Sequence, residues 1–133
     1  MNKKIILIAE DDTSIINVLN ERLINEGFNV FEAKNGEDGL KIALQEHPDL
    51  ILVDILMPKM DGLTMLKKLH EDEWGKNAHF IILTNVSEVD QIGDAIKLAG
   101  VVSTNKNQYF EYYIKSEIKL EQLVGKIKQK LGV

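Results

Sequence analysis

The sequence predicts an α/β fold, in which a parallel β-sheet carries helices on both faces, and two features of its 133 residues lead to this prediction. Short apolar runs rich in Ile, Leu and Val alternate along the chain with longer segments whose apolar residues recur every three or four positions. The runs are typical of buried strands and the longer segments of amphipathic helices. Strict alternation of the two favours crossover connections, which place helices on the faces of a parallel sheet.

Five runs predict strands. The run after the N-terminus is β-branched, and the run at 50–53 consists of Leu, Ile and Val alone, as expected for a strand buried on both faces. The run at 28–33 alternates apolar and polar residues and predicts a strand with one more exposed face. The expected strands are Lys4–Ala9, Phe28–Ala33, Leu50–Val53, His79–Leu83 and Tyr112–Ile114.

Each predicted strand is followed by a segment with helical spacing. Gly27, Pro48 and Gly100 stand where three of these segments should end. Trp74–Asn77 and the polar stretch at 101–110 predict loops. The expected helices are Thr13–Glu26, Glu37–Glu46, Leu63–Glu71, a segment from Ser87 or Glu88 to Ala99, and a last helix that includes Leu120 and Leu131.

Composition narrows the function classes. The net charge of −5 argues against a direct nucleic-acid footprint, which needs a basic face. The chain has no Cys, so disulfides, thiolate zinc sites and cysteine nucleophiles are excluded. No apolar run approaches the ~20 residues of a membrane span, and Ile5–Ala9 is too short for a signal peptide. We therefore expect one cytoplasmic domain over residues 1–133 with no membrane partner.

Polar side chains stand at the end of four predicted strands. Because the carboxyl ends of parallel strands share one edge of a sheet, we expect these side chains to converge there. Asp12 is better placed to cap the following helix than to bind a ligand. The residues delivered to this edge are Glu10, Asp11, Asp12, Asp54, Thr84 and Lys115.

Clustered carboxylates repel one another unless a cation lies among them, and oxygen ligands without His or Cys favour a hard ion such as Mg²⁺. Glu10 and Asp11 form the pair suited to the metal. Asp54, at the end of the central strand, is the candidate nucleophile for phosphoryl transfer. Thr84 and Lys115 could donate hydrogen bonds or charge to phosphoryl oxygens.

Four motifs in order carry a family resemblance: KIILIAEDD, LILVDILMPKMDG, FIILTN and YYIKS, each at a predicted strand end. With them the chain resembles, over essentially its whole length, a receiver domain of bacterial two-component response regulators of the chemotaxis-regulator type. The resemblance implies a flavodoxin-like, doubly wound sheet with strand order 2-1-3-4-5 and five helices on both faces. It also implies a phosphoacceptor switch that acts on no separate substrate, although such a domain can catalyse its own phosphorylation and dephosphorylation.

The resemblance assigns the phosphorylation site and its metal. Asp54 would accept the phosphoryl group from the phosphohistidine of a histidine kinase or phosphotransfer protein. Asp11 and Asp54 would bind Mg²⁺, with Glu10 helping partly through water, and the backbone carbonyl of Leu56 would be a further ligand.

The resemblance also assigns a switch. Thr84 would bond the phosphoryl oxygens and move inward on activation, Lys115 would pair with Asp54 or its phosphoryl group, and the rotamer of Tyr112 would follow Thr84. Inward packing is the alternative for Tyr112, since Tyr109 and Tyr113 lie nearby. The fourth helix, fifth strand and last helix would bind a downstream protein, and the domain would be a monomer or a phosphorylation-dependent homodimer.

The chain departs from the family pattern at four places. Ser116 follows Lys115 where the family usually has Pro, so the Lys115–Ser116 bond is either trans, with altered aim of the lysine, or a costly cis bond. The stretch between Gly100 and Lys115 is longer than usual. Asn85 replaces a small residue and could restrict access to the phosphoryl site, and Leu56 offers only its carbonyl to the metal.

Three alternatives stay open. A degenerate receiver would bind partners without phosphorylation, and Ser116 is the residue that favours it. A phosphatase or transferase of the haloacid-dehalogenase type would need a DxD pair after the first strand, where this chain has Glu10-Asp11-Asp12. A flavodoxin-like cofactor carrier would need a Ser/Thr/Gly-rich phosphate loop at the same place.

Overall fold

Parallel strands form the centre of the computed structural model, which describes residues 3–85 and 111–133. In these ranges five strands pair side by side in the order β2–β1–β3–β4–β5, every pair parallel. Both the parallel sheet and its 2-1-3-4-5 order are therefore confirmed. The strands are β1 (Ile5–Ala9), β2 (Asn29–Ala33), β3 (Leu50–Val53), β4 (Phe80–Thr84) and β5 (Glu111–Ile114).

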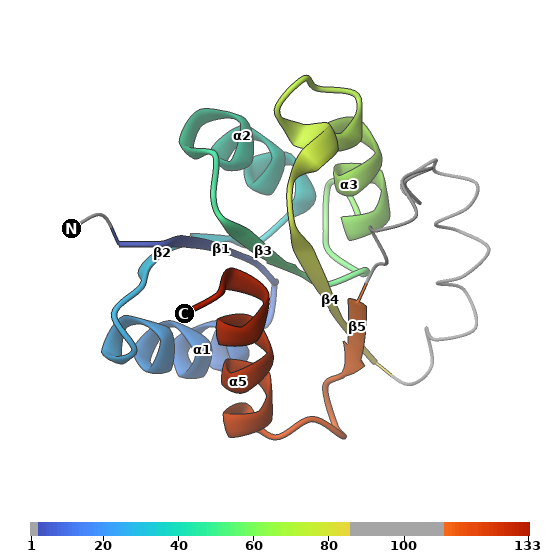
Figure 1. The fold of residues 1–133 in the computed structure, drawn as a ribbon. Helices are drawn as coiled ribbons and strands as arrows, with labels where there is room; N and C mark the ends of the chain where they lie inside the picture. The colour runs from blue at the N-terminus through green and yellow to red at the C-terminus, as the bar shows by residue number, and fades with distance from the viewer. Residues whose placement is uncertain (1–2, 86–110) are drawn as a thin grey trace.

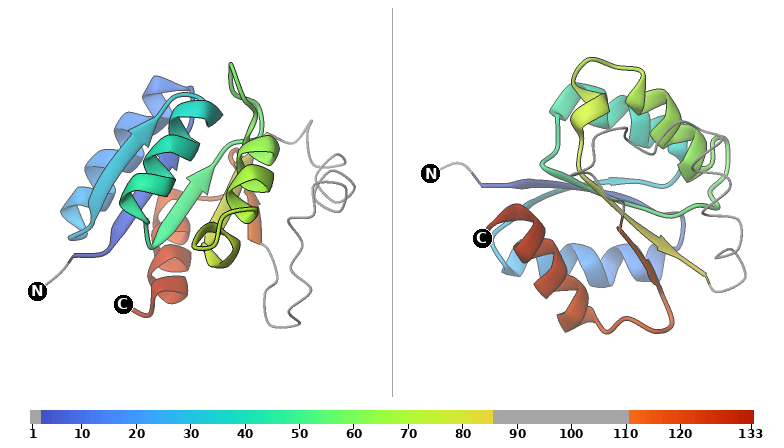
Figure 2. Two further views of the ribbon diagram at one scale, coloured as in Figure 1. Left: turned by 90° about the horizontal axis from the view of Figure 1, so that it is seen from above. Right: turned by 45° about the vertical axis from the view of Figure 1, so that its right-hand side comes forward.

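Helices cover both faces of the sheet, as Figures 1 and 2 show: α1 and α5 lie on one face, α2 and α3 on the other. The helix expected between Ser87 and Ala99 and the loop expected at 101–110 lie outside the described residues. Trp74–Asn77, predicted as a loop, contains the 3₁₀ helix η1 (Gly75–Asn77). The described α-helices are α1 (Thr13–Asn25), α2 (Gly36–Glu46), α3 (Gly62–His70) and α5 (Leu120–Leu131). None of them has the length and apolar content that crossing a bilayer requires.

The core has one apolar layer on each face of the sheet, and β3 contributes to both. Its alternate residues Ile51 and Val53 pack in the layer beneath α2 and α3, whereas Leu50 and Leu52 pack in the layer beneath α1 and α5. All four are at most 1% exposed, and burial of each such side chain contributes about 1.5–3 kcal/mol. This explains why an unbroken apolar run forms the centre of the sheet.

Side-chain caps decide where three helices begin. The Asp12 carboxylate accepts hydrogen bonds from the Ser14 and Ile15 amides at the start of α1, so its expected capping role is confirmed. The Asn35 side chain caps α2 and the Asp61 side chain caps α3. With Asn35 and Asp61 as caps, α2 and α3 each begin one residue before their predicted starts.

Two aspartates at the amino-terminal edge of the sheet accept hydrogen bonds from backbone amides. Asp49 Oδ2 accepts a hydrogen bond of 2.7 Å from the Ile5 amide at the start of β1. Asp72 Oδ2 accepts from the amides of Trp74 and Gly75, which explains the 3₁₀ turn there. The His47 ring stacks on Trp74 with ring centroids 4.3 Å apart. These contacts join the helix–strand connections at the edge opposite the predicted site.

Candidate functional site

Three backbone hydrogen bonds extend the sheet one residue past the strands at its carboxyl edge. The Glu10 amide donates to the Ala33 carbonyl at 2.9 Å, and the Asp54 amide donates to the Ala9 carbonyl at 2.9 Å. Farther along the same edge, the Lys115 amide donates to the Thr84 carbonyl at 2.8 Å. The hydrogen-bond pattern of the sheet therefore continues to Glu10, Asp54 and Lys115, although these residues follow the strands.

The carboxylates of Glu10, Asp11 and Asp54 gather at this edge. One oxygen from each residue lies within 4.8 Å of the others, a spacing that could hold a metal ion. Glu10 is 3% and Asp54 4% exposed, whereas Asp11 faces solvent. Two acids are thus withdrawn from water beside a third that remains accessible. The structure brings together the two acids that the strand pattern assigned to the metal, Glu10 and Asp11, and the candidate nucleophile Asp54.

Lys115 provides the positive charge in this cluster. Its ammonium nitrogen lies 2.8 Å from Glu10 Oε2 and 3.0 Å from Asp54 Oδ2. Burial lowers the pKa of Lys115, but its hydrogen bonds to Glu10 and Asp54 outweigh that effect and hold the pKa above its ordinary value. Burial raises the pKa of Glu10, the charge of Asp54 adds to the rise, and Lys115 opposes it.

Lys115 reaches the acids without a following proline. No peptide bond in the described residues is cis, so the Lys115–Ser116 bond is trans. The backbone turns because the carbonyl of Ile114 accepts hydrogen bonds of 2.9 Å from the Glu117 amide and 3.1 Å from the Ile118 amide. Of the two alternatives for Ser116, the structure has the trans bond, and Lys115 still points to Asp54.

The structure places the remaining predicted site residues on β4, on β5 and in the loop between β3 and α3. Thr84 is the fully buried last residue of β4, and its backbone pairs with Ile114 of β5. Leu56 follows Asp54 by two residues in the loop between β3 and α3, with its side chain 56% exposed. Tyr112 on β5 is 41% exposed. The inward-packing role falls to its neighbour Tyr113, which packs against the layer beneath α1 and α5.

Comparison with known proteins decides the family. The family model described as "Response regulator receiver domain" matches residues 6–110. This chain belongs to the response regulator receiver family. The chain is 39% identical over 101 residues to "Sporulation initiation phosphotransferase F" of Bacillus subtilis, a match that covers 76% of this chain and 79% of that protein. It covers only 30% of the "Alkaline phosphatase synthesis transcriptional regulatory protein PhoP" of the same organism, to which it is 42% identical over 73 residues.

Solved receiver structures share the fold. A CheY-like "response regulator receiver domain protein" from Methanospirillum hungatei aligns with a TM-score of 0.80 and 29% identity, over 98% of this chain and 95% of that one. A receiver domain of the sensor histidine kinase PA1611 from Pseudomonas aeruginosa aligns with a TM-score of 0.81 and 22% identity, over 99% of this chain and 100% of that one. That structure is described with a magnesium ion coordinated in the active site cleft.

The donors at the carboxyl edge of this receiver domain fit a magnesium ion. The three residues that could hold a metal in the described parts of the chain supply carboxylate oxygens, the ligands that hard divalent cations prefer. Lys115 hydrogen-bonds Oε1 of Glu10 at 2.9 Å and lies 2.8 Å from Oε2, so both oxygens of Glu10 have a cationic neighbour.

Gly62 holds the end of the loop that follows Asp54, a role that the sequence pattern missed. A Cβ atom on Gly62 would lie 2.0 Å from the Asp54 carbonyl oxygen, closer than any side chain can approach. The Gly62 amide also donates a 2.7 Å hydrogen bond to the Ile55 carbonyl. The sequence marked Gly62 only as a turn former, because a contact across eight residues leaves no trace in the local pattern.

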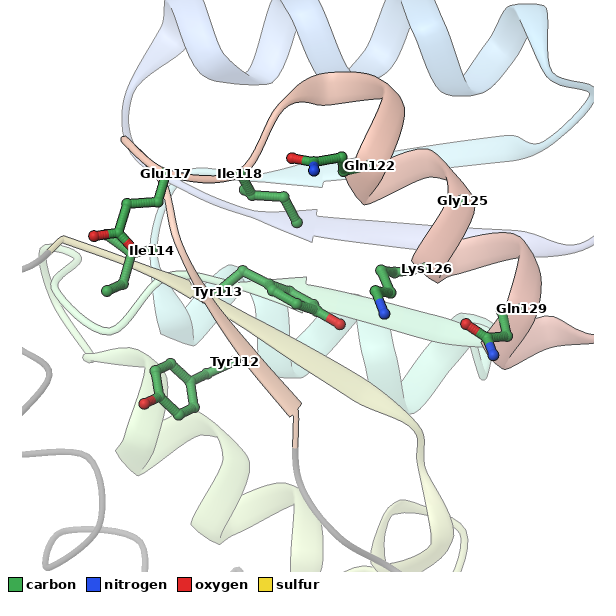
Figure 3. Close-up of a pocket in the computed structure, with 9 residues that line it drawn as sticks. All are labelled: Tyr112, Tyr113, Ile114, Glu117, Ile118, Gln122, Gly125, Lys126 and Gln129. Atoms are coloured by element: carbon green, nitrogen blue, oxygen red, sulfur yellow. The ribbon is translucent and has the colours of Figure 1, made fainter.

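A cavity of about 700 Å³ opens between β5 and α5 of the receiver domain. Figure 3 shows Tyr112 and Tyr113 on opposite sides of β5, with Tyr113 directed toward α5. The cavity combines the Tyr113 ring with the polar and charged side chains of α5 and the preceding turn. Its lining residues are Tyr112, Tyr113, Ile114, Glu117, Ile118, Gln122, Gly125, Lys126 and Gln129.

Proposed function

We propose that residues 1–133 form one receiver domain in which Asp54 accepts a phosphoryl group from the phosphohistidine of a histidine kinase or phosphotransfer protein, in a reaction that requires Mg²⁺. The observation that carries this proposal is the buried Asp54 carboxylate, 3.0 Å from the Lys115 ammonium and beside the acids Glu10 and Asp11. The complete set of acids and the lysine does not favour a degenerate receiver that acts without phosphorylation.

In the transfer step, an Asp54 carboxylate oxygen attacks the phosphorus atom of the donor. The new O–P bond forms as the P–N bond to the donor imidazole breaks, and its electron pair stays on that nitrogen. The product is an acyl phosphate on Asp54. Lys115 offsets the negative charge that the phosphoryl oxygens carry, and the Thr84 hydroxyl would donate a hydrogen bond to one of them.

Asp11 and Asp54, with the backbone carbonyl of Leu56, would hold the magnesium ion, and Glu10 would contribute partly through water. A bound Mg²⁺ neutralises phosphoryl oxygens and orients them for in-line attack. Support comes from the oxygen-only donor set and from the fold shared with the magnesium-bound receiver of PA1611.

The output surface in this proposal is formed by β5, α5 and the expected fourth helix, which lies outside the described residues. Tyr112 would change rotamer with Thr84 when Asp54 is phosphorylated, and the β5–α5 cavity of Figure 3 would receive a downstream protein or a second copy of the domain. The exposed ring of Tyr112 supports this role, because an exposed aromatic can change its rotamer without disrupting the core.

The decisive experiment is phosphorylation by a small-molecule donor. Incubation with acetyl phosphate or phosphoramidate and Mg²⁺ should add the mass of one phosphoryl group to the intact protein, and EDTA should prevent the addition. Asp54→Asn should add none. An unmodified wild-type protein, or an Asp54→Asn protein that is labelled equally, would overturn the proposal.

We also propose that the domain catalyses loss of its own phosphoryl group, at a rate that depends on Asn85. Asn85 directly follows the buried Thr84 and is itself exposed, so its side chain stands at the border between the site and solvent. Asn85→Ala should open the approach of water and shorten the lifetime of the acyl phosphate, measured by intact mass after the donor is removed. Equal lifetimes would remove Asn85 from the proposal.

A further inference from the structure

The loop between β3 and α3 rests against the start of α2. The Gly36 amide donates a 2.9 Å hydrogen bond to the carbonyl oxygen of Met60. A Cβ atom built on Gly36 would lie 2.3 Å from that oxygen, 2.9 Å from the Met60 carbonyl carbon and 3.0 Å from the Asp61 carbonyl oxygen. Real Cβ contacts essentially never fall below 3.0 Å. Only glycine at position 36 therefore allows the loop backbone to approach α2 this closely.

Met60 is held from within the loop as well. Its amide donates a 2.7 Å hydrogen bond to the Pro58 carbonyl, which closes a three-residue turn around Lys59. Lys59 has a φ of 67°, in the left-handed region that a lysine seldom adopts. Neighbouring structure must hold a non-glycine residue in such a conformation, and the hydrogen bond from Gly36 to Met60 is one contact that does so.

The loop thus has two fixed points, and Leu56 lies between them. At the base, Gly62 donates to the carbonyl of Ile55, directly after Asp54. At the tip, Met60 accepts from Gly36. The four residues 56–59 must span the distance from Ile55 to Met60, so displacement of Met60 changes the path of the backbone that leaves Asp54. The position of this segment relative to Asp54 depends on the contact with α2.

We propose that Gly36, outside the acidic cluster at the start of α2, is a positioning residue for the metal and phosphoryl site. It sets the distance between α2 and the loop that carries the backbone of Leu56. Gly36 touches neither metal nor phosphoryl group in this proposal and acts through Met60. The inference depends on the proposed function, because it concerns the Mg²⁺ affinity of the same site.

Asn35 caps α2 and thereby fixes the orientation of the Gly36 amide. Its side chain is only 6% exposed, accepts a 2.8 Å hydrogen bond from the Asp38 amide and donates one of 2.9 Å to Asp38 Oδ2. Its backbone carbonyl accepts from the Gly39 amide at 3.0 Å. The first turn of α2 is therefore fixed by Asn35, and the amide that meets the loop is fixed with it.

The primary test is the Mg²⁺ affinity of Gly36→Ala, measured by isothermal titration calorimetry on the full chain after circular dichroism has shown that it is folded. Substitutions that disturb the support of metal ligands cost roughly 10–100-fold in affinity, so we expect binding at least about 10-fold weaker than in the wild type. The rate of labelling by acetyl phosphate should fall most at low Mg²⁺ and recover toward the wild-type rate at saturating Mg²⁺. Wild-type affinity in a folded Gly36→Ala protein would overturn the proposal.

Gly39→Ala is the matched control in the same helix. Its Cβ would meet the flexible Met65 side chain, with Sδ at 3.0 Å, instead of the loop backbone. Because an unbranched methionine can move aside, we expect Mg²⁺ affinity within about 2-fold of the wild type. An equal loss in Gly39→Ala and Gly36→Ala would show a general effect of α2 and contradict a specific role of Gly36.

A second pair of variants tests the contact without adding atoms at the loop. Asn35→Ala removes the cap of α2 and should weaken Mg²⁺ binding several-fold, whereas Asn35→Ser keeps a capping oxygen and should restore most of the affinity. Equal affinity in Asn35→Ala and the wild type would contradict the inference, even if Gly36→Ala does not fold. Absence of Mg²⁺ binding by the wild type would instead refute the proposed function.

Discussion

Acidic residues at the two edges of the sheet have opposite surroundings. At the carboxyl edge, Glu10 and Asp54 are buried together and share one ammonium group, that of Lys115. At the amino-terminal edge, Asp49 accepts from the Ile5 amide and Asp72 from the amides of Trp74 and Gly75. Each acid at this second edge has its own donors.

The difference separates acids that stabilise the fold from acids that bind a charged group. A carboxylate that accepts backbone hydrogen bonds replaces water with equivalent donors and gains stability locally. Carboxylates that crowd together lose solvation and repel each other, which lowers stability. A nearby cation offsets this cost. The carboxyl edge is therefore distinguished by buried acids that share one cation, Lys115, and not by the presence of acids alone.

The largest effect on stability is expected for Lys115→Met. The change keeps an apolar side chain but leaves Glu10 and Asp54 buried without their ammonium partner, which should lower the free energy of unfolding by about 3 kcal/mol. Urea denaturation without Mg²⁺ measures this, and added Mg²⁺ should restore part of the loss. Lys76→Met is the control, since its exposed pair with Glu73 should contribute at most about 0.5 kcal/mol. Equal effects of the two changes would show that the cluster does not depend on Lys115.

Asp49→Ala should lower the free energy of unfolding but leave the rate of phosphorylation unchanged. Loss of the hydrogen bond from the Ile5 amide leaves a partly buried donor without its acceptor, at a cost of about 1–2 kcal/mol. Labelling by acetyl phosphate should keep its wild-type rate when measured at a temperature where the variant is folded. A slower reaction in fully folded Asp49→Ala would break the proposed separation between the two edges.

Asp54→Asn is expected to stabilise the metal-free protein by roughly 1 kcal/mol, because it removes one of the two crowded charges while Glu10 keeps its pair with Lys115. The same change should abolish the increase in melting temperature that Mg²⁺ gives the wild type. Thermal unfolding with and without Mg²⁺ measures both effects. A clearly less stable metal-free variant would show that Asp54 contributes to the fold as Asp49 does.

The smallest effect concerns Glu26, at the end of α1 near the amino-terminal edge. Hydrogen bonds from Lys128 and Arg22 hold the pKa of Glu26 below its ordinary value, so folding favours the ionised form. The resulting stability is present above the unfolded-state pKa of about 4.3 and is lost as the pH falls through the lower folded-state value. Wild type should therefore melt slightly higher than Glu26→Gln at neutral pH, and the difference should vanish in acid.

Lys128→Met serves as the second half of a double-mutant cycle for this contact. In the Lys128→Met background, Glu26→Gln should change the melting temperature less than it does in the wild type. A difference that stays constant from neutral to acid pH would show that the charge of Glu26 does not stabilise the fold.

Much of the fold could be predicted because the apolar and polar pattern of each segment matches the burial that the segment has in the fold. β3 begins and ends at its predicted residues, since Asp49 and Asp54 bound an uninterrupted apolar run. The positions of Glu10, Asp11 and Asp54 at one edge followed from the strand ends and the parallel sheet alone. Helix starts were predicted less accurately, because a cap such as Asn35 is a side-chain contact and apolar spacing does not record it.

The contacts that join distant segments could not be predicted from the sequence. Lys115 and Glu10 are 105 residues apart, and their pairing depends on side-chain conformations that only the folded structure defines. Gly36 and Met60 approach through backbone atoms, so neither side chain reveals the contact. The trans Lys115–Ser116 bond likewise depends on the hydrogen bonds accepted by Ile114.

The backbone hydrogen bonds of Glu10, Asp54 and Lys115 to neighbouring strands have a consequence for signalling. Residues anchored to adjacent chains on a central sheet cannot shift their main-chain atoms without breaking those bonds. If Asp54 is phosphorylated as proposed, the change would therefore spread through side-chain rotations, such as those proposed for Thr84 and Tyr112, and through segments outside the sheet, while the strands stay in place.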